Sequence, residues 1–276
     1  MDWLTAQNEL STSLAPLYGE REATVIADWV TEALSGKKKL ERLGMRGVGL
    51  STDELAELGR CKQELLAHRP VQYVLGESWF AGEKFFVDER VLIPRPETEE
   101  LVDWAASAVS GTVLDVGTGS GCIAVTLARR LNGATAMACD VSGGALEVAR
   151  RNAAALRAEV QFFELDFLDR GSWGALPPVD WVVSNPPYIR FSEEGEMARH
   201  VIDYEPNTAL FVPNEDALVF YRALGEFARE RGSGLFAEIH EERGSAVQQV
   251  LLGMGAREVE LRKDLQGKDR MIKATW

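Results

Sequence analysis

The sequence predicts an α/β protein in which a largely parallel sheet is covered by helices on both faces and closed by an antiparallel hairpin at one edge. From about residue 111, short apolar runs alternate with helical segments, which is the pattern of a parallel sheet. Before residue 70, apolar residues recur at the helical spacings of three and four. We therefore expect a helical domain over residues 1–70, a β-hairpin linker over 71–93, and an α/β domain over 94–276.

The first 70 residues predict helices over residues 2–14, 20–34 and 51–70. The third helix opens on Ser51 and Glu54, which stand at the spacing of a capping box, and it closes at Pro70. No residue pattern typical of catalysis occurs here. We expect this domain to recognise a partner.

Two β-type runs, Tyr73–Leu75 and Lys84–Val87, are separated by Gly76 and Gly82 and predict the linker hairpin. Helices are expected over residues 121–131, 143–156 and 215–231. The strands expected between and after them are Thr112–Val116, Ala134–Cys139, Val160–Phe163, Val179–Ser184 and Leu235–Ile239, followed by an edge hairpin of Glu258–Arg262 and Arg270–Thr275.

Composition excludes several classes of function. The net charge of −13 is unlike that of a protein that grips duplex DNA, so we expect no direct nucleic-acid binding and a partner that is a protein or small molecule. The chain lacks an apolar run of the length of a membrane span, and its start lacks the features of a signal peptide, so a cytoplasmic protein is expected. Cys61, Cys122 and Cys139 are scattered without a C-x-x-C pair, which predicts neither a zinc site nor a disulfide framework.

A glycine-rich loop, "VLDVGTGSG", follows the first strand of the expected sheet. Glycines at alternate positions let the backbone turn tightly and let a ligand approach closely. A dinucleotide-binding fingerprint would place its third glycine at position 122, which is Cys122. A tight turn without a ligand therefore stays open as an alternative for this loop, whose residues are Gly117, Thr118, Gly119, Ser120 and Gly121.

Acidic residues end the next two strands. Asp140 stands about 20 positions after the loop in the sequence, where an acidic residue can accept hydrogen bonds from ribose hydroxyls. It could instead cap the following helix. Asp166 and Phe167, just past the third strand, suit the amino group and the face of an adenine. Together these residues predict a nucleoside ligand across the ends of three strands.

The tetrapeptide Asn185-Pro186-Pro187-Tyr188 ends the fourth strand beside the same edge. Taken alone it is explained as a turn, because two prolines cannot continue a buried strand. Next to a nucleoside site, the arrangement resembles the Rossmann-like class I S-adenosylmethionine-dependent methyltransferases that methylate a nitrogen conjugated to a π system.

Methyl transfer to such a nitrogen explains these four residues. The lone pair of an amide nitrogen is delocalised, so two acceptors that hold its N–H bonds would aim it at the methyl group. The side-chain oxygen of Asn185 and the backbone carbonyl of Pro186 can be these acceptors, Pro187 stiffens the loop, and Tyr188 can stack on the planar group. A strong general base is not required, and the sequence shows no convincing His or Glu near the motif.

Further motifs narrow the resemblance. The segments "RPVQYVLG", "FFVDERVLIPRPETEELV", "LDVGTGSGCIAVTLA", "VSNPPYI", "YEPNTALF" and "DLQGKDRMI" are similar to those of the peptide chain release factor N5-glutamine methyltransferases, over about Arg69 to Ile272. The resemblance implies methyl transfer from S-adenosylmethionine, leaving S-adenosylhomocysteine, to the glutamine of the Gly-Gly-Gln loop of class I release factors, which modulates translation termination. It also implies cofactor contacts from residues 117–121, Asp140, Asp166, Phe167 and Asn185, and a glutamine site formed by Asn185, Pro186, Pro187 and Tyr188 with Arg95 and Glu97 nearby.

Other functions fit parts of the sequence. A glutamine methyltransferase acting on a ribosomal protein would carry the same motifs. An adenine-N6 DNA or RNA methyltransferase could share the glycine loop and N-P-P-Y, but the acidic composition and the lack of a basic target-recognition region argue against it. A non-catalytic interaction protein would have no need of all three motifs.

Overall fold

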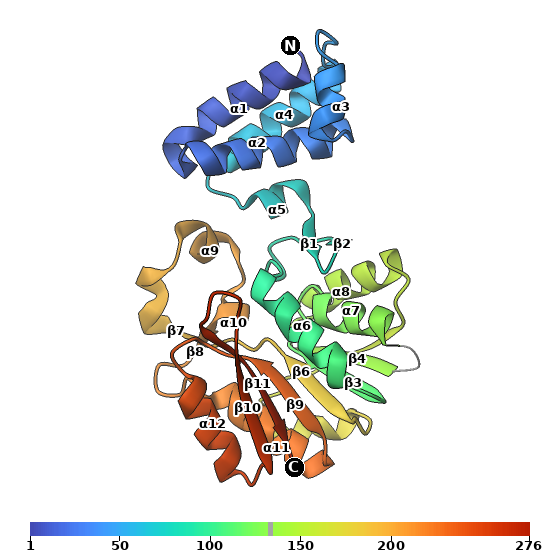
Figure 1. Ribbon diagram of the computed structural model, residues 1–276, viewed down its shortest axis with the longest axis vertical. Helices are drawn as coiled ribbons and strands as arrows, with labels where there is room; N and C mark the ends of the chain where they lie inside the picture. The colour runs from blue at the N-terminus through green and yellow to red at the C-terminus, as the bar shows by residue number, and fades with distance from the viewer. Residues whose placement is uncertain (132–134) are drawn as a thin grey trace. The chain divides into compact units, whose positions relative to one another are not determined.

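The structure is a computed structural model that describes residues 1–131 and 135–276. Contacts between Cα atoms divide the chain into two compact units, whose elements are labelled in Figure 1. The first unit comprises Met1–Gly76 and Ala198–Tyr204, and the second comprises Glu77–Met197 and Glu205–Trp276. Among the described residues, no helix combines the length and the apolar character needed to cross a membrane.

The first unit is helical. Its elements are α1 (Trp3–Tyr18), α2 (Glu20–Ser35), α3 (Lys39–Gly44), α4 (Thr52–Leu66), α5 (Val71–Leu75) and α9 (Arg199–Tyr204). The predicted capping box is present at the start of α4, where Ser51 Oγ accepts from Glu54 N at 3.2 Å and Ser51 N donates to Glu54 Oε2 at 2.7 Å. The longer helices bury one apolar face each, which includes Leu10, Leu14 and Leu65.

The short helix α3 was not predicted, because "KKKLERLG" carries little apolar periodicity. A buried cation positions it instead: the Arg42 side chain is fully buried and pairs with Asp28 of α2. Helix α9 also joins this unit from a distant part of the chain. The Tyr204 hydroxyl donates to the Ala67 carbonyl at 2.7 Å.

The predicted strand Tyr73–Leu75 is wrong, because these residues form α5. Pro70 precedes the first turn of this helix, and Gly76 ends it in the left-handed conformation at φ 67°. A short apolar run fits a strand and a helix equally well, so its flanking residues decide. The hairpin is formed by β1 (Ser78–Phe80) and β2 (Glu83–Phe85) instead.

The second unit contains a seven-stranded sheet in the order β10-β11-β9-β6-β3-β4-β5. The parallel strands are β3 (Thr112–Val116), β4 (Thr135–Asp140), β5 (Val160–Glu164), β6 (Trp181–Ser184) and β9 (Gly234–Glu238), and the antiparallel hairpin is β10 (Glu258–Lys263) with β11 (Asp269–Thr275). The predicted Rossmann-like sheet with an antiparallel edge hairpin is therefore confirmed. Ala134, the predicted first residue of the second strand, lies outside the described residues.

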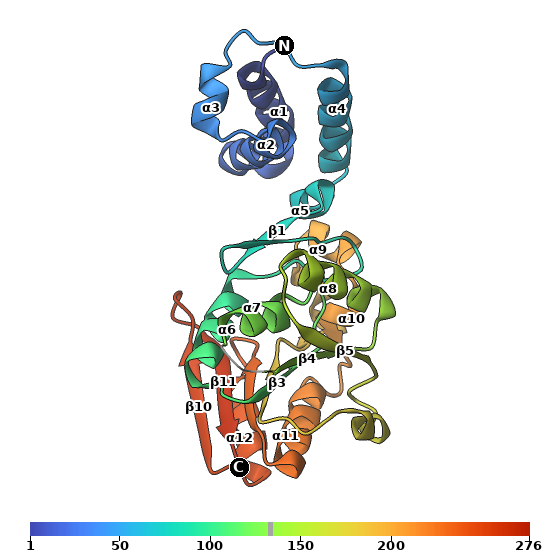
Figure 2. The same cartoon turned by 90° about the vertical axis from the view of Figure 1, so that its right-hand side faces the viewer.

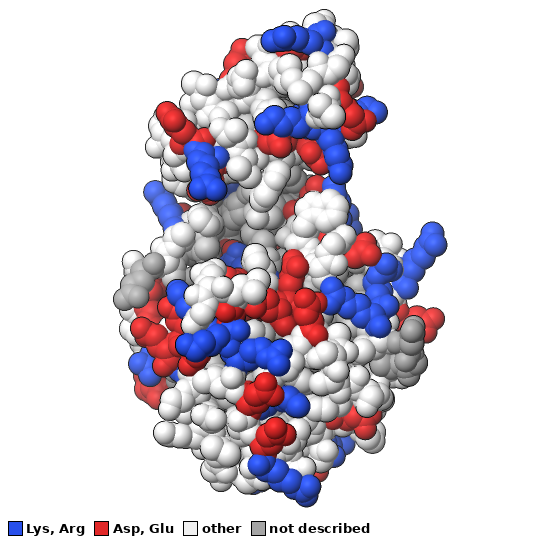
Figure 3. Space-filling model, in the orientation of Figure 1, with Lys and Arg blue, Asp and Glu red and all other residues white. Residues whose placement is uncertain are grey.

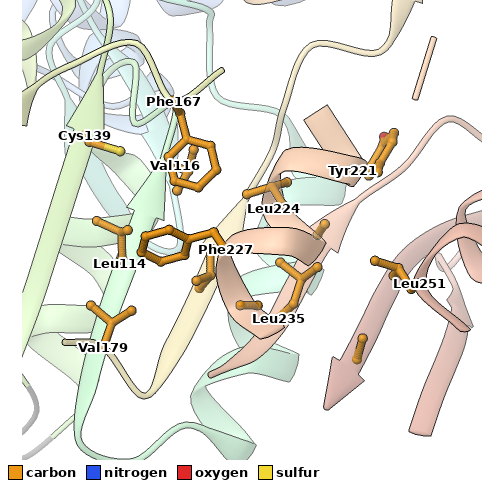
Figure 4. Close-up of a cluster of buried hydrophobic side chains, with 14 of the residues drawn as sticks. Leu114, Val116, Cys139, Phe167, Val179, Tyr221, Leu224, Phe227, Leu235 and Leu251 are labelled. Atoms are coloured by element: carbon orange, nitrogen blue, oxygen red, sulfur yellow. The ribbon is translucent and has the colours of Figure 1, made fainter. Parts of the chain in front are cut away.

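Helices cover both faces of this sheet (Figure 2). One face carries α6 (Pro96–Ala108), α7 (Cys122–Arg130) and α8 (Gly143–Ala155), and the other carries α11 (Val219–Arg231) and α12 (Gly244–Gly253). Each face of the sheet has its own hydrophobic core, the first beneath α6, α7 and α8 and the second beneath α11 and α12. Successive strand residues point to opposite faces, so Val113 packs in the first core and Leu114 in the second. Figure 4 shows Leu224 and Phe227 of α11 in the second core, on the side of the sheet to which Leu114 points.

Helix α11 begins at Val219, not at residue 215 as predicted. Asp216 N donates to the Pro213 carbonyl at 3.1 Å, and Asp216 Oδ1 accepts from Leu218 N at 3.2 Å. These bonds form a turn before the helix. Further short elements complete the unit: η1 (Arg170–Ala175), β7 (Ile189–Arg190), η2 (Phe191–Glu196), α10 (Asn207–Leu210) and β8 (Phe211–Val212).

The strand order places two loops side by side. The chain runs from β3 outward to β4 and β5, then returns to the opposite side of β3 as β6. In open α/β sheets, ligands bind at such a reversal, beyond the carboxyl ends of the strands. The loop after β3 is the glycine loop, and the loop after β6 is N-P-P-Y.

Candidate active site

The glycine loop leads from β3 into α7 with a backbone that only glycine adopts readily. Gly117, Gly119 and Gly121 have φ of 71°, 52° and 81°, in the left-handed region. A Cβ added to Gly117 or Gly119 would meet nothing within 4 Å, so the backbone there borders open space. A Cβ on Gly121 would lie 3.1 Å from the Ala149 Cβ. The first two glycines therefore leave room for a ligand, and the third lets the loop pack on α8.

Asp140 is bonded directly to this loop. Its Oδ2 accepts from Gly119 N at 2.9 Å, and its Oδ1 accepts from Ser142 N at 2.9 Å. Burial raises the pKa of Asp140. Ser142, not Asp140, caps α8, because its hydroxyl accepts from Ala145 N at 3.1 Å. Each carboxylate oxygen keeps a second lone pair, as needed to accept from ribose hydroxyls.

A second carboxyl group lies beneath the loop. Asp115 Oδ2 accepts from Thr118 Oγ1 at 2.6 Å and from Ala124 N at 3.1 Å. Its Oδ1 is buried and has no hydrogen-bond partner among the described residues. Burial raises the pKa of Asp115 to about 7. Such an unpaired acceptor suits a site that a polar ligand or water completes.

A pocket opens beyond the strand ends and collects many of the predicted site residues. Those that line it are Gly117, Gly119, Asp140, Asp166, Phe167, Asn185 and Pro187. The Phe167 side chain packs in the core, with its ring centroid 5.5 Å from that of Trp173, and still borders the pocket. Sequence reasoning did not single out other lining residues, which include Arg90, Val91, Leu92, Pro206, Thr208 and Ala209.

The remaining predicted residues lie outside the described lining of this pocket. They are Thr118, Ser120, Gly121, Pro186, Tyr188, Arg95 and Glu97. Thr118 and Ser120 are buried within the loop. Arg95 Nη2 contacts both carboxylate oxygens of Glu205, at 2.7 and 2.8 Å, and the Glu205 side chain is fully buried. Glu97 lies in the first turn of α6.

The N-P-P-Y motif joins a buried polar network. Asn185 Nδ2 donates to Thr98 Oγ1 at 3.1 Å. The Thr98 hydroxyl donates to Glu238 Oε2 at 2.6 Å, and the Tyr188 hydroxyl donates to Glu238 Oε1 at 3.2 Å. Glu238 is only 1% exposed, and burial raises its pKa to about 7. The sequence offered no convincing acidic residue near the motif, and the structure places Glu238 there, bonded to Tyr188 directly and to Asn185 through Thr98.

Relatives of the chain are similar over almost its full length. Residues 96–210 match the family described as Methyltransferase small domain. The release factor glutamine methyltransferase of Flavobacterium psychrophilum is 36% identical, over 96% of this chain and 95% of the relative. That of Bacteroides thetaiotaomicron is 38% identical, over 95% and 96%.

The chain belongs to the release factor glutamine methyltransferase family. It is therefore a methyltransferase, as the motifs predicted.

Solved structures agree with the fold of this methyltransferase. The hMettl16 catalytic domain, in complex with the MAT2A 3'UTR hairpin 6, covers 82% of this chain and 82% of its own at a TM-score of 0.56 and 14% identity. The human methyltransferase 10 domain containing protein covers 83% and 98% at a TM-score of 0.52 and 16% identity. At such low identity, the likeness concerns the fold.

The ion pair of Arg95 with Glu205 lies next to one wall of the pocket of the methyltransferase. Glu205 directly precedes Pro206, Thr208 and Ala209, which line the pocket. Both halves of the pair lie in conspicuous segments, "IPRPETE" and "YEPNTALF", yet nothing in the sequence indicated that they meet. The ion pair thus gives Arg95 a structural role at the edge of the site.

Replacing Arg95 with Ala is expected to lower the free energy of unfolding by about 1–3 kcal/mol, because a buried carboxylate loses a charged donor. Arg95→Lys should retain part of this stability, since an ammonium keeps the charge but not the bidentate geometry. Chemical denaturation measures both. As a control, Arg130 pairs with the exposed Asp103 of the same unit, and Arg130→Ala should change stability by less than about 0.5 kcal/mol. Equal losses for Arg95→Ala and Arg130→Ala would contradict this role.

Proposed function

We propose that the protein transfers a methyl group from S-adenosylmethionine to the side-chain amide nitrogen of the glutamine in the Gly-Gly-Gln loop of class I peptide chain release factors. The observation that carries the proposal is that Asn185, an amide acceptor, borders the same pocket as the glycine loop and Asp140, in a chain of this family. The reaction leaves S-adenosylhomocysteine and takes place in the cytoplasm.

The residues around the pocket fit the methyl donor. Gly117 and Gly119 leave space against their backbone, and the Asp140 carboxylate has lone pairs free for the two ribose hydroxyls. The carboxylate of Asp166 would accept from the adenine amino group, and the side chain of Phe167 would lie against the adenine. Thr118, Ser120 and Gly121 shape the loop. When bound, the cofactor supplies an activated methyl group on a sulfonium sulfur.

The glutamine would be held by the N-P-P-Y loop. Asn185 Oδ1 accepts one N–H of the substrate amide, and the Pro186 carbonyl accepts the other. The ring of Pro187 borders the pocket and limits motion of this carbonyl. With both N–H bonds held, the lone pair of the nitrogen would point at the methyl group. The hydrogen bonds that bind the glutamine would thus also orient it for the reaction. The methylated nitrogen is strongly acidic and releases its proton to water.

The charge of the molecule supports a protein partner. The net charge is −13, and a strongly acidic surface attracts basic partners. On the face drawn in Figure 3, Lys and Arg side chains of the described residues are interspersed with Asp and Glu and do not merge into one basic surface. The helical domain of residues 1–70 recognises the release factor in this proposal, Tyr188 contacts the glutamine, and Arg95 and Glu97 border its site.

Methyl transfer from radiolabelled S-adenosylmethionine to a panel of acceptors tests the proposal. A purified class I release factor, ribosomal proteins, duplex DNA and an RNA hairpin are each incubated with the protein. We expect label on the release factor alone. Label on a ribosomal protein or on nucleic acid, with none on the release factor, would assign the enzyme to one of the other two activities.

A further inference from the structure

We propose that Thr98 and Glu238 are positioning residues that fix which end of the Asn185 side-chain amide faces the substrate. The inference rests on the proposed function, in which Asn185 Oδ1 accepts a hydrogen bond from the substrate glutamine. It concerns a group two hydrogen bonds away from the pocket. The same carboxylate also accepts from the Tyr188 hydroxyl, so it is linked to both ends of the N-P-P-Y motif, to Tyr188 directly and to Asn185 through Thr98.

The three side chains come from different elements of the second unit. Asn185 follows β6, Thr98 lies in the first turn of α6, and Glu238 ends β9. Thr98 is 2% exposed and Glu238 is 1% exposed, so water does not compete for their hydrogen bonds. The bonds run without a gap, from Asn185 Nδ2 to Thr98 Oγ1 over 3.1 Å and from Thr98 Oγ1 to Glu238 Oε2 over 2.6 Å.

The chemistry of the three side chains allows the hydrogen bonds from Asn185 through Thr98 to Glu238 to run in one direction only. A carboxylate only accepts, so the single hydroxyl proton of Thr98 must point to Glu238. Toward Asn185 the Thr98 oxygen can then only accept. Asn185 must therefore present its NH₂ group to Thr98, which leaves Oδ1 as the end available to the substrate. With the opposite orientation, an NH₂ group would face the N–H bonds of the substrate amide and repel them.

This direction depends on the charge of Glu238. Burial raises its pKa to about 7, whereas its hydrogen bonds with Thr98 and Tyr188 and the charge of Arg270 lower it. A protonated Glu238 can donate to Thr98, whose own proton is then free to point at Asn185 Oδ1. The amide can flip, and the acceptor at the pocket is lost. The competent orientation is therefore enforced above pH about 7 and lost as pH falls through that value.

The charged and titratable groups around Glu238 come from several elements, and His240 lies beyond Tyr188, with their ring centroids 5.9 Å apart. Burial lowers the pKa of His240 below its usual value, so its titration is distinguished from that of Glu238 by the Glu238→Gln variant. Burial raises the pKa of Cys122 of α7 to about 12, and it also raises the pKa of Tyr188 and Tyr221. Arg270 of β11 stays cationic and also contacts Asp264 at 3.1 Å. Glu97 of α6 is the acidic group whose charge adds to the rise at Glu238.

Near-isosteric variants test the inference. Glu238→Gln can donate as well as accept, and Thr98→Val removes the hydroxyl while keeping the shape. For each we expect kcat to fall by about 10- to 100-fold, the scale of a misplaced catalytic contact. The dissociation constant for S-adenosylmethionine should stay within about twofold of the unsubstituted value, because neither residue lines the pocket. Thr98→Ser keeps the hydroxyl and should restore most of kcat.

The pH profile separates this role from a general loss of structure. For the unsubstituted enzyme we expect kcat to rise through pH about 7, and for Glu238→Gln and Thr98→Val we expect a low, flat profile. The control is Ser233→Ala. Ser233 is equally buried, and its hydroxyl donates to the Val179 carbonyl at 2.5 Å, near the amino ends of the strands. This variant should keep both kcat and the rise with pH.

A readout without turnover distinguishes this inference from the proposed function. The side-chain NH₂ signals of Asn185, assigned by NMR through their loss in Asn185→Ala, should shift with an inflection near pH 7 and lose it in Glu238→Gln. If the release factor is not methylated but these signals follow Glu238, the proposed function fails and the positioning role stands. Unchanged signals, or full turnover in both Glu238→Gln and Thr98→Val, would overturn the positioning role.

Discussion

Replacing Asn185 with Ala is expected to lower kcat by about 10²- to 10³-fold, which is the cost of removing one preorganised hydrogen-bonding group at a reacting centre. Asn185 borders the pocket, and its side-chain NH₂ group donates a hydrogen bond to the Thr98 hydroxyl. The substituted enzyme loses an acceptor that aims the substrate nitrogen, but it keeps the glycine loop and Asp140. The dissociation constant for S-adenosylmethionine should therefore change by less than about fivefold.

Single-turnover methylation of a release factor at saturating cofactor measures this effect, with calorimetry for cofactor binding. A matched control is Asn214→Ala, which removes another amide from the same unit. Asn214 is exposed, and its Oδ1 accepts from Ser192 N at 2.9 Å. We expect this variant to turn over normally. Turnover of Asn185→Ala at the rate of Asn214→Ala would refute the mechanism given for the motif.

Replacing Asp140 with Ala is expected to act mainly on cofactor binding, raising the dissociation constant for S-adenosylmethionine by about 10- to 100-fold. A hydrogen bond to a charged group is worth about 1.5–3 kcal/mol, and each 1.4 kcal/mol is about tenfold in affinity. The change also removes the acceptor for Gly119 N and Ser142 N, so the loop keeps only its backbone hydrogen bonds from Gly117 N and Thr118 N to the Cys139 carbonyl of β4. Asp140→Asn keeps one oxygen and should bind with intermediate affinity.

A carboxylate at the amino ends of the strands, opposite the pocket, offers a control for Asp140. Asp180 precedes β6, is exposed, and accepts from Thr112 N at 2.7 Å. Asp180→Ala removes a carboxylate that bonds a strand in the same way, but far from the pocket along the strand direction. Its cofactor affinity should match that of the unsubstituted enzyme. An unchanged affinity in Asp140→Ala would show that the ribose is held elsewhere.

The parallel sheet could be predicted because each strand is buried on both faces. Such strands read as short continuous apolar runs, and Val113 and Leu114 are adjacent yet serve different cores. The short helices α3 and α5 could not be predicted, because tertiary contacts or flanking residues decide them. Arg42 positions α3 by pairing with a distant helix, and Gly76 ends α5.

The candidate site likewise contains features that could be predicted from the sequence and contacts that could not. The glycine loop, Asp140 and Asn185 stand at strand ends, so their convergence follows from the strand order. The pair of Arg95 with Glu205 and the network of Thr98 with Glu238 join residues more than 100 positions apart, and local pattern carries no information about such contacts. One signal for Glu238 was present: a carboxylate interrupts the apolar run "LFAEI" of a central strand. A charge in a buried strand indicates that another side chain pairs or hydrogen-bonds with it.

The central claim is that the methyl group reaches a glutamine side-chain nitrogen held by Asn185. Mass mapping of a release factor incubated with the enzyme and S-adenosylmethionine tests it most directly. We predict a single added methyl group on the glutamine of the Gly-Gly-Gln peptide, and none when that glutamine is replaced by Glu. A methyl group on any other residue, or an unmodified peptide after complete incubation, would contradict the claim.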